Sequence, residues 1–236
     1  MSNNYFKFKQ FTIFQDGCAM KVGTDGCLLG GWFCCKESNR ILDIGCGSGL
    51  IAIMAAQRCN ARITGIEIDT QAAEQARKNV EESPWRERID IINGDFLKFN
   101  PSELFDTIVS NPPYFVNSLK CDNSSRTLAR HSDSLGSFDF FEKAGELLTP
   151  DGRISIIIPC DILEEWKKSA EENNFTTTRL TYIKTTPRKV AKRVLAEFSR
   201  NTSNKKSKEN TLVLEESPGC YTADAKEILQ DFYIKL

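Results

Sequence analysis

The chain has 236 residues, a formal net charge of -1 at pH 7, 40% hydrophobic residues and 27% charged residues. These values are typical of one globular α/β domain, and the near-neutral balance excludes a protein that attracts polyanions through its overall charge. We expect a single domain over residues 1–236, with an N-terminal extension over 1–36 and the main body over 37–236.

The sequence predicts neither a membrane-spanning helix nor a metal site. No run reaches the roughly 18 apolar residues of a bilayer-spanning helix, and the first residues lack the apolar part of a signal peptide. The nine cysteines are odd in number and include no C-x-x-C pair; the nearest to a motif is Cys34-Cys35. We therefore expect reduced thiols in a cytoplasmic protein. His131 is the only histidine, which argues against a zinc site of the usual Cys/His spacing.

The first 36 residues predict a small extension. Alternating apolar residues before and after Asp16-Gly17 favour a β-hairpin that turns at this pair. Asp25 is then predicted to cap a short helix that runs through Trp32.

Short apolar strands and helices alternate through the middle of the chain. The predicted strands are 41–44, 62–67, 89–92, 105–110 and 153–158, and the predicted helices are 50–59, 70–82, 138–148 and 162–172. This alternation is typical of a parallel, doubly wound sheet with helices on both faces.

The tail breaks that alternation. Residues 177–185, 193–200 and 211–215 are strand-like with no helix between them, which indicates antiparallel additions at the edge of the sheet. Residues 201–210 form a polar loop, and a last helix is predicted over 223–229.

A glycine-rich segment joins the first strand to its helix. Asp43 ends the strand, and Gly45, Gly47 and Gly49 follow at G-x-G-x-G spacing. Glycines let a ligand lie against the backbone, and a helix N-terminus adds N–H donors. The dinucleotide fingerprint requires G-x-G-x-x-G, and its last glycine position is Leu50 here. A glycine loop alone is weak evidence, and a purely structural turn remains an alternative.

Acidic residues end the next two strands. Glu67, with Ile68 beside it, stands 18 positions after Gly49, near the offset at which an acidic residue binds ribose hydroxyls in nucleotide-binding α/β folds. Asp69 is the better helix cap, which leaves Glu67 for the ribose. Asp95 could accept from an adenine amine and Phe96 could cover the ring, although Asp95 considered alone is more often a loop residue.

Asn111-Pro112-Pro113-Tyr114 follows the fourth strand. The two prolines fix φ and force Asn111 into an extended conformation. The resulting rigid elbow offers an amide oxygen, the Pro112 carbonyl and an aromatic ring, a set that can hold a planar amino group and orient its lone pair. Tyr114 could stack on that group, or its ring could face the core.

The order of these motifs resembles that of the class I S-adenosylmethionine-dependent methyltransferases. The resemblance implies a three-layer, Rossmann-like, mostly parallel seven-stranded sheet with the last strand antiparallel. It implies that Gly45, Gly47 and Gly49 approach S-adenosylmethionine, that Glu67 holds its ribose and that Asp95 holds its adenine.

A closer resemblance covers nearly the whole chain. The segments 8–16, 18–26, 111–120 and 231–235 look like those of the bacterial tRNA(Val) adenine-37 N6-methyltransferases. This resemblance implies methyl transfer to adenine N6 beside the anticodon, with a tRNA anticodon stem-loop as partner. We expect the enzyme to be a monomer.

Clustered basic residues support an RNA partner independently of this resemblance. The expected RNA-binding residues are Arg126, Arg130, Lys184, Arg188, Lys189, Lys192 and Arg193. His131 is as readily a loop hydrogen bonder as a substrate contact. The basic run continues through Arg200 and Lys205–Lys208, where lysines that protect an edge strand from aggregation are an equal alternative.

Other functions share parts of this pattern. A glutamine-N5 methyltransferase of release factors has the same elbow, but that family usually carries a helical N-terminal domain. An rRNA guanine-N2 methyltransferase and a non-catalytic S-adenosylmethionine-binding module are further alternatives. The glycine spacing disfavours a nicotinamide dehydrogenase.

Overall fold

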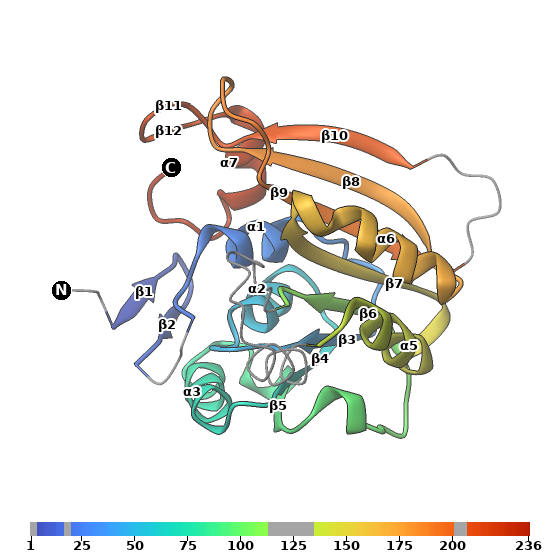
Figure 1. The fold of residues 1–236 in the computed structure, drawn as a ribbon. Coiled ribbons are helices and arrows are strands. Elements are labelled where there is room, and N and C mark those ends of the chain that lie inside the picture. The colour runs from blue at the N-terminus through green and yellow to red at the C-terminus, as the bar shows by residue number, and fades with distance from the viewer. Residues whose placement is uncertain (1–3, 17–19, 113–134, 201–206) are drawn as a thin grey trace, which may run out of the picture.

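An eight-stranded sheet forms the middle layer of the protein (Figure 1). The computed structural model describes residues 4–16, 20–112, 135–200 and 207–236. The strand order across the sheet is β10-β8-β9-β7-β6-β3-β4-β5. In chain order the strands are β3 (Arg40–Ile44), β4 (Arg62–Glu67), β5 (Ile89–Asn93), β6 (Phe105–Ser110), β7 (Leu148–Pro159), β8 (Thr176–Lys184), β9 (Arg193–Ser199) and β10 (Lys208–Val213).

Only β9 runs against the other strands of this sheet. Strands β3 to β7 pair in parallel, β9 pairs antiparallel with both β7 and β8, and β10 pairs in parallel with β8. The predicted mostly parallel α/β sheet is confirmed, and the last of its seven expected strands, β9, is antiparallel. The prediction of antiparallel additions at the edge was wrong in two respects. Strand β9 lies inside the sheet, and β10 is an eighth strand that runs parallel to its neighbour.

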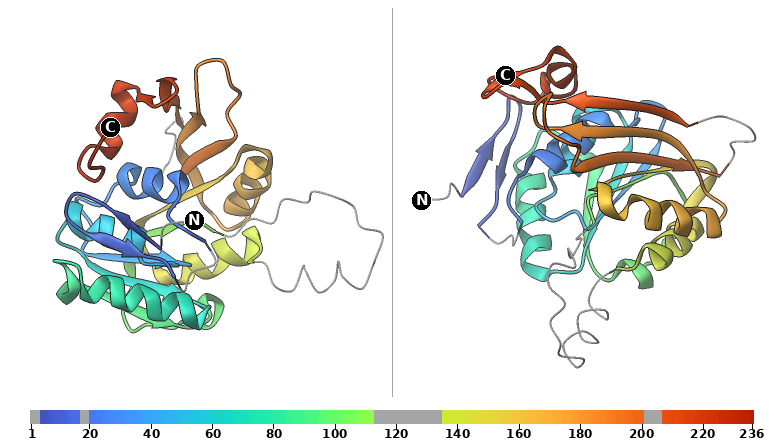
Figure 2. Two further views of the ribbon diagram at one scale, coloured as in Figure 1. Left: turned by 90° about the vertical axis from the view of Figure 1, so that its left-hand side faces the viewer. Right: turned by 45° about the horizontal axis from the view of Figure 1, so that its top comes forward.

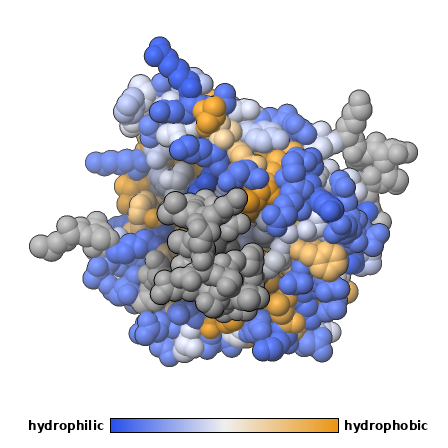
Figure 3. Space-filling model, viewed as in Figure 1, coloured by the Kyte–Doolittle hydropathy of each residue, from blue (hydrophilic) through white to orange (hydrophobic). Residues whose placement is uncertain are grey.

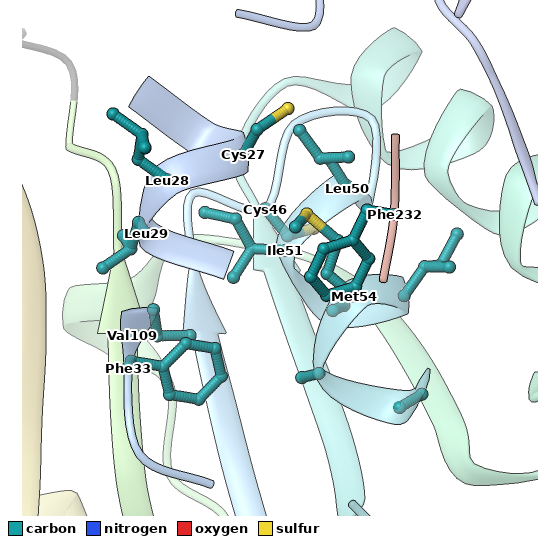
Figure 4. Packing of buried hydrophobic residues seen from close by; sticks show 14 of the residues in the cluster. Cys27, Leu28, Leu29, Phe33, Cys46, Leu50, Ile51, Met54, Val109 and Phe232 are labelled. Carbon is teal, nitrogen blue, oxygen red and sulfur yellow. The ribbon is translucent and has the colours of Figure 1, made fainter. Parts of the chain in front are cut away.

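Helices cover both faces of the sheet and define two apolar clusters. The first cluster lies under α1 (Thr24–Trp32), α2 (Leu50–Arg58), α3 (Thr70–Glu81) and α7 (Ala223–Leu229). Figure 4 shows its centre, where Phe232 lies beside Met54 of α2, and Val109 of β6 lies beside Phe33. The second cluster lies under α5 (Ser137–Leu147) and α6 (Leu163–Glu172). Helix α3 shows why these helices pack on the sheet: each needs to bury an apolar stripe. In α3 this stripe consists of Ala72, Ala73, Ala76 and Val80, as predicted.

Besides the N-terminal hairpin, five short elements lie outside the main sheet and its covering helices. They are the 3₁₀ turns η1 (Arg86–Arg88), η2 (Phe96–Lys98) and η3 (Cys160–Ile162), and a two-stranded ribbon of β11 (Glu215–Ser217) and β12 (Cys220–Tyr221). Within residues 4–16, 20–112, 135–200 and 207–236, no helix combines the length and apolarity that a bilayer crossing needs.

The N-terminal hairpin is present, but it turns earlier than predicted. Strands β1 (Tyr5–Lys7) and β2 (Thr12–Phe14) pair antiparallel. The Phe8 N–H donates to the Phe11 carbonyl at 2.9 Å, and the two rings stack at 4.5 Å in the core. Burial of these rings therefore decides the position of the turn, and the polar pair Asp16-Gly17 follows the second strand.

Two further local predictions were wrong for similar reasons. Gly23, not Asp25, occupies the N-cap of α1, because Asp25 is drawn into an ion pair with Arg193 at 2.8 Å. Residues 208–210 belong to β10, where pairing with β8 overrides their polar, loop-like sequence.

Candidate active site at the carboxyl edge of the sheet

The predicted site residues meet at one edge of the sheet. Ile44 is in register with Ile66 on one side and with Ser110 on the other, and Glu67 is in register with Asn93. Because these strands are parallel, the segments that leave their carboxyl ends all emerge at the same edge, with neighbouring strands about 4.8 Å apart. The glycine loop, Glu67 and Asn111 are therefore neighbours. The left view of Figure 2 looks toward this side of the molecule.

The glycine loop is open toward solvent. Gly45, Gly47 and Gly49 have φ values of 66°, 53° and 80°, a left-handed conformation that side chains rarely adopt. A Cβ placed on Gly45 or Gly47 would have no atom within 4 Å. The loop thus leaves room for a ligand against its backbone, at the N-terminus of α2.

Glu67 connects the loop to the next strand. Its carboxylate accepts from the Gly47 N–H at 2.9 Å and from the Asp69 N–H at 3.0 Å. Asp69 itself caps α3 by accepting from the Ala72 N–H at 2.7 Å, as the sequence predicts. Glu67 therefore holds the loop while each carboxylate oxygen keeps lone-pair capacity for a ligand hydroxyl. Ile68 is 71% exposed beside it and offers an apolar surface to a planar ring.

Asp43 lies beneath the loop and is fully buried. One carboxylate oxygen accepts from the Ala52 N–H at 3.1 Å, and the other has no hydrogen-bond partner among the described residues. Burial raises the pKa of Asp43 to about 7, with a further contribution from the nearby charge of Glu67. Asp43 thus supports the start of α2 from below the loop, and its predicted contact with the cofactor stays a prediction.

The pKa of Asp43 makes stability pH-dependent. The unfolded chain loses this proton near the ordinary pKa of 3.8, whereas the folded protein keeps it up to about pH 7. The folded state therefore binds the extra proton between these values, so its stability falls as the pH rises through that window. We expect Asp43→Asn to abolish this pH dependence. Between pH 4.5 and 7.5, the wild-type free energy of unfolding should therefore fall by about 2 to 4 kcal/mol more than that of the variant.

Urea unfolding of the ligand-free protein at the two pH values measures this difference. Asp90→Asn is the matched control, because Asp90 is exposed on β5. An equal pH dependence in Asp43→Asn and wild type would contradict the expectation.

Asp95 and Phe96 follow β5 at the same edge. One Asp95 oxygen accepts from the Leu97 N–H at 3.0 Å, and the other lies 3.3 Å from the exposed Lys98 ammonium. The Phe96 ring packs in the core, 5.9 Å from the Phe140 ring. It therefore cannot serve as the predicted cover over an adenine ring, and Phe96 can offer a ligand only its backbone.

The side-chain oxygen of Asn111 is a hydrogen-bond acceptor that no donor among the described residues satisfies. This Oδ1 atom is buried. The preceding Ser110 hydroxyl donates to the Ile44 carbonyl at 2.8 Å, which fixes the end of β6 beside the glycine loop. A buried acceptor left unpaired is costly unless a ligand satisfies it. Tyr114, Arg126, Arg130 and His131 lie outside the described residues.

Sequence reasoning missed Asn79, a buried residue of α3. Its amide exchanges two hydrogen bonds with the backbone of Phe14, at 2.9 Å and 2.8 Å, and also donates to the Ser48 carbonyl at 2.9 Å. It therefore ties the N-terminal hairpin to the glycine loop. Its spacing was the one usable signal: Asn79 stands three residues after Ala76, within the apolar stripe of the helix.

The structure divides the basic run between two edges. Arg188, Lys189 and Lys192 are exposed in the β8–β9 connection, which projects from the body in the left view of Figure 2. Because β8 is parallel to β6, this connection emerges at the edge where Asn111 lies. Three strand spacings of about 4.8 Å separate them laterally, or roughly 14 Å.

The remaining basic residues have other surroundings. Lys184 is partly buried at the end of β8, and Arg193 is committed to its ion pair with Asp25. Lys208 begins β10 at the opposite edge of the sheet, and near that edge Arg200 donates to the Gly145 carbonyl at 2.9 Å. Lys205 and Lys206 lie outside the described residues. The face in Figure 3 is mostly hydrophilic, with small apolar patches.

A cavity of about 930 Å³ lies away from this edge. Its lining includes Trp32, Arg58 and Arg179 near the opposite ends of the strands, together with residues of α7 and β10. None of the predicted cofactor or substrate residues lines it. Open glycine backbone, a carboxylate and an unpaired acceptor converge at the carboxyl edge instead.

Solved structures of methyltransferases share this α/β fold. A predicted O-methyltransferase from Agrobacterium tumefaciens matches with a TM-score of 0.70, at 20% identity, over 88% of this chain and 96% of that one. A class I S-adenosylmethionine-dependent methyltransferase from Listeria monocytogenes matches with a TM-score of 0.60, at 16% identity, over 86% and 68% of the two chains. The fold is that of a class I methyltransferase.

Sequence relatives narrow the class to one family. The family model "Methyltransferase small domain" matches residues 24–165. Proteins of Phocaeicola vulgatus and Bacteroides thetaiotaomicron, both named tRNA1(Val) (adenine(37)-N6)-methyltransferase, are 45% and 43% identical to this chain over the full length of each. The chain belongs to this family of methyltransferases.

Proposed function

We propose that this enzyme transfers a methyl group from S-adenosylmethionine to N6 of adenine 37 in a valine tRNA. The observation that carries the proposal is the buried, unpaired Oδ1 of Asn111 beside the open glycine loop. An acceptor at this place requires a donor from the substrate, and an exocyclic amine supplies one. The names of the full-length relatives supply the particular nucleotide.

The chemistry requires orientation of a weak nucleophile. The lone pair of adenine N6 is delocalised into the ring, so it attacks poorly in the plane. Asn111 Oδ1 and the Pro112 carbonyl accept the two amino hydrogens and direct the lone pair toward the donor. S-adenosylmethionine supplies an electrophilic methyl group on a sulfonium. No strong general base is required, because the methylated amine is acidic enough to release its proton to water. Orientation of this kind is worth up to roughly 7–11 kcal/mol in favourable cases.

The residues of the carboxyl edge fit the cofactor. Gly45 and Gly47 provide open backbone, and Gly49 follows them at the packed start of α2. Glu67 provides a carboxylate for two ribose hydroxyls. Ile68 provides an exposed apolar surface for adenine, and Asp95 an acceptor for its amine once Lys98 moves aside.

The RNA surface is proposed to extend from Asn111 toward the β8–β9 connection. Arg188, Lys189 and Lys192 are exposed there on the same side as the site. Lys184 ends β8 and Arg193 begins β9, so they lie at the two ends of this connection and are part of the same proposed RNA surface. Arg126 and Arg130 complete the proposed set of RNA-binding residues. A base in an anticodon loop is partly unstacked already, which lowers the cost of bringing it into the site. We propose that the chain acts as a single methyltransferase domain and as a monomer in the cytoplasm.

The Arg188→Ala/Lys189→Ala double variant should weaken tRNA binding and reduce its salt dependence. Removal of two phosphate contacts should lower the slope of log K against log salt by about 1.4 to 1.8. Filter binding at several salt concentrations measures this slope. Lys168→Ala/Lys208→Ala is the matched control, because both lysines are exposed away from the site. Equal slopes in the two double variants would remove the β8–β9 connection from the RNA surface.

Methylation of a panel of purified, unmodified tRNAs tests the function as a whole. With labelled S-adenosylmethionine, the label should enter a valine tRNA at N6 of adenine 37. Release factors carrying the substrate glutamine and naked small-subunit rRNA are assayed in parallel. Labelling of either of these, with none in tRNA, would overturn the proposal.

A further inference from the structure

The buried amide of Asn79 connects the N-terminal hairpin to the glycine loop. Strand β2 of the hairpin lies beside α3, which carries Asn79 (Figure 1). The amide Oδ1 accepts from the Phe14 N–H, and its two N–H groups donate to the Phe14 and Ser48 carbonyls. The side chain is 1% exposed. It therefore pairs with Phe14 as a neighbouring strand would, and it holds the loop with its remaining donor.

The bond to Ser48 acts on the backbone of the loop. The Ser48 carbonyl and the Gly49 N–H belong to one planar peptide, and that N–H donates to the Cys46 carbonyl at 2.8 Å. Asn79 thus fixes one end of this peptide, and the loop's own backbone fixes the other. Glycine backbone has many accessible conformations, so a glycine loop keeps one of them only where contacts from outside hold it. Glu67 supplies one such contact, and Asn79 supplies a second.

The hairpin gives Asn79 a fixed support. Phe8 and Phe11 are buried in the first apolar cluster, and the Lys9 N–H donates to the Phe232 carbonyl at 2.8 Å. The hairpin is thus anchored to the core and to the C-terminal segment independently of the loop. A hydrogen-bonded path therefore runs from the anchored hairpin through Asn79 to the loop.

We propose that Asn79 is a positioning residue for S-adenosylmethionine, through which the N-terminal hairpin holds the glycine loop in its binding conformation. The inference rests on the proposed function, because S-adenosylmethionine is the methyl donor of that reaction. Asn79 is too buried to touch a ligand, so it acts only by keeping the loop ordered before the cofactor arrives. Linkage requires the reverse effect as well: a cofactor that orders the loop also strengthens the hold of Asn79 on the hairpin.

Calorimetric titration of the full-length protein with S-adenosylmethionine, in the absence of tRNA, is the first test. Asn79→Ala should raise the dissociation constant about 3- to 10-fold, because the freed loop must be ordered as the cofactor binds. Asn79→Ser keeps one hydroxyl donor and should give an intermediate value. Thr181→Ala is the matched control. It also breaks a buried hydrogen bond, with Trp32 Nε1 at 3.0 Å, but it does so in the cavity away from the carboxyl edge and should leave the dissociation constant unchanged.

Hydrogen exchange of the wild-type protein provides a second test that needs no variant. The Gln15 N–H, which donates to the Asn4 carbonyl at 2.9 Å, reports on the hairpin. Saturating S-adenosylmethionine should slow its exchange by the same factor of about 3 to 10, since coupling between two sites is reciprocal. The slowing should disappear in Asn79→Ala, because the path from the loop to the hairpin is then broken.

Three results would overturn the positioning role. They are a dissociation constant in folded Asn79→Ala within about twofold of wild type, wild-type exchange at Gln15 that the cofactor leaves unchanged, or slowing that persists in folded Asn79→Ala. Circular dichroism checks the fold of each variant, and if Asn79→Ala does not fold, Asn79→Ser and the wild-type exchange decide. Wild-type protein that fails to bind S-adenosylmethionine in the titration would instead overturn the proposed function itself, and this inference with it.

Discussion

Replacement of Asn111 by alanine is expected to lower kcat for methyl transfer at least about 100-fold, because the oriented acceptor acts on the amino group as it becomes a nucleophile. The dissociation constant for S-adenosylmethionine should change less than about threefold, since no bond of the glycine loop or Glu67 involves this side chain. Single-turnover assays with tRNA measure the rate, and calorimetric titration measures cofactor binding.

Two comparisons make this result specific. Asn60→Ala removes an amide that is exposed at the opposite edge and should leave both quantities unchanged. Asn111→Asp keeps the shape and the acceptor but adds a charge to a buried position, and thermal unfolding shows whether it remains folded. Wild-type rates in Asn111→Ala would remove the orientation mechanism, even if the enzyme methylates tRNA.

Replacement of Glu67 by alanine should act on the other half of the reaction. Loss of a charged acceptor for ribose hydroxyls costs about 1.5–3 kcal/mol, so the dissociation constant for S-adenosylmethionine should rise about 10- to 100-fold. The same change frees the N–H groups of Gly47 and Asp69, which Glu67 holds at 2.9 Å and 3.0 Å. Calorimetric titration of the cofactor, without tRNA, measures the effect.

Glu67→Gln separates the two contributions. The amide keeps one acceptor oxygen for the loop but turns an NH₂ toward a second donor, so binding should fall by an intermediate amount. Glu74→Ala is the control, because Glu74 is exposed on the outer side of α3. Unchanged cofactor affinity in Glu67→Ala would show that Glu67 is only a structural link between the strand and the loop.

The central part of the fold could be predicted because its signals are local. Buried parallel strands such as β4 are short, continuous apolar runs, and α3 carries its apolar residues at helical spacing with Asp69 as its cap. The N-terminal hairpin was harder to place, because stacking of Phe8 on Phe11 outweighs the turn preference of Asp16-Gly17. Partners far away in the chain likewise decide the start of β10 and the role of Asp25.

The same distinction holds for the site. Glycine, acidic and amide motifs at the ends of successive strands could be predicted to converge, because parallel strands end at one edge. The hydrogen bonds of Asn79 could not be predicted, because its partners Phe14 and Ser48 lie 65 and 31 positions away in the chain. The burial of the Phe96 ring could not be predicted either, because it depends on packing against Phe140, which lies far away in the chain.

The sequence by itself determined the chemistry available to this protein: a glycine loop, Glu67 and the Asn111-Pro112 elbow, each at the end of a buried strand. Spacing along the chain is enough for this, because strand and helix periods are local properties. Only the tertiary structure decided which charges lie at the same edge of the sheet as Asn111. It placed Arg188 and Lys189 at the edge that holds Asn111 and Lys208 at the opposite edge. Strand direction and strand order set these distances, and both depend on hydrogen bonds between segments far apart in the chain.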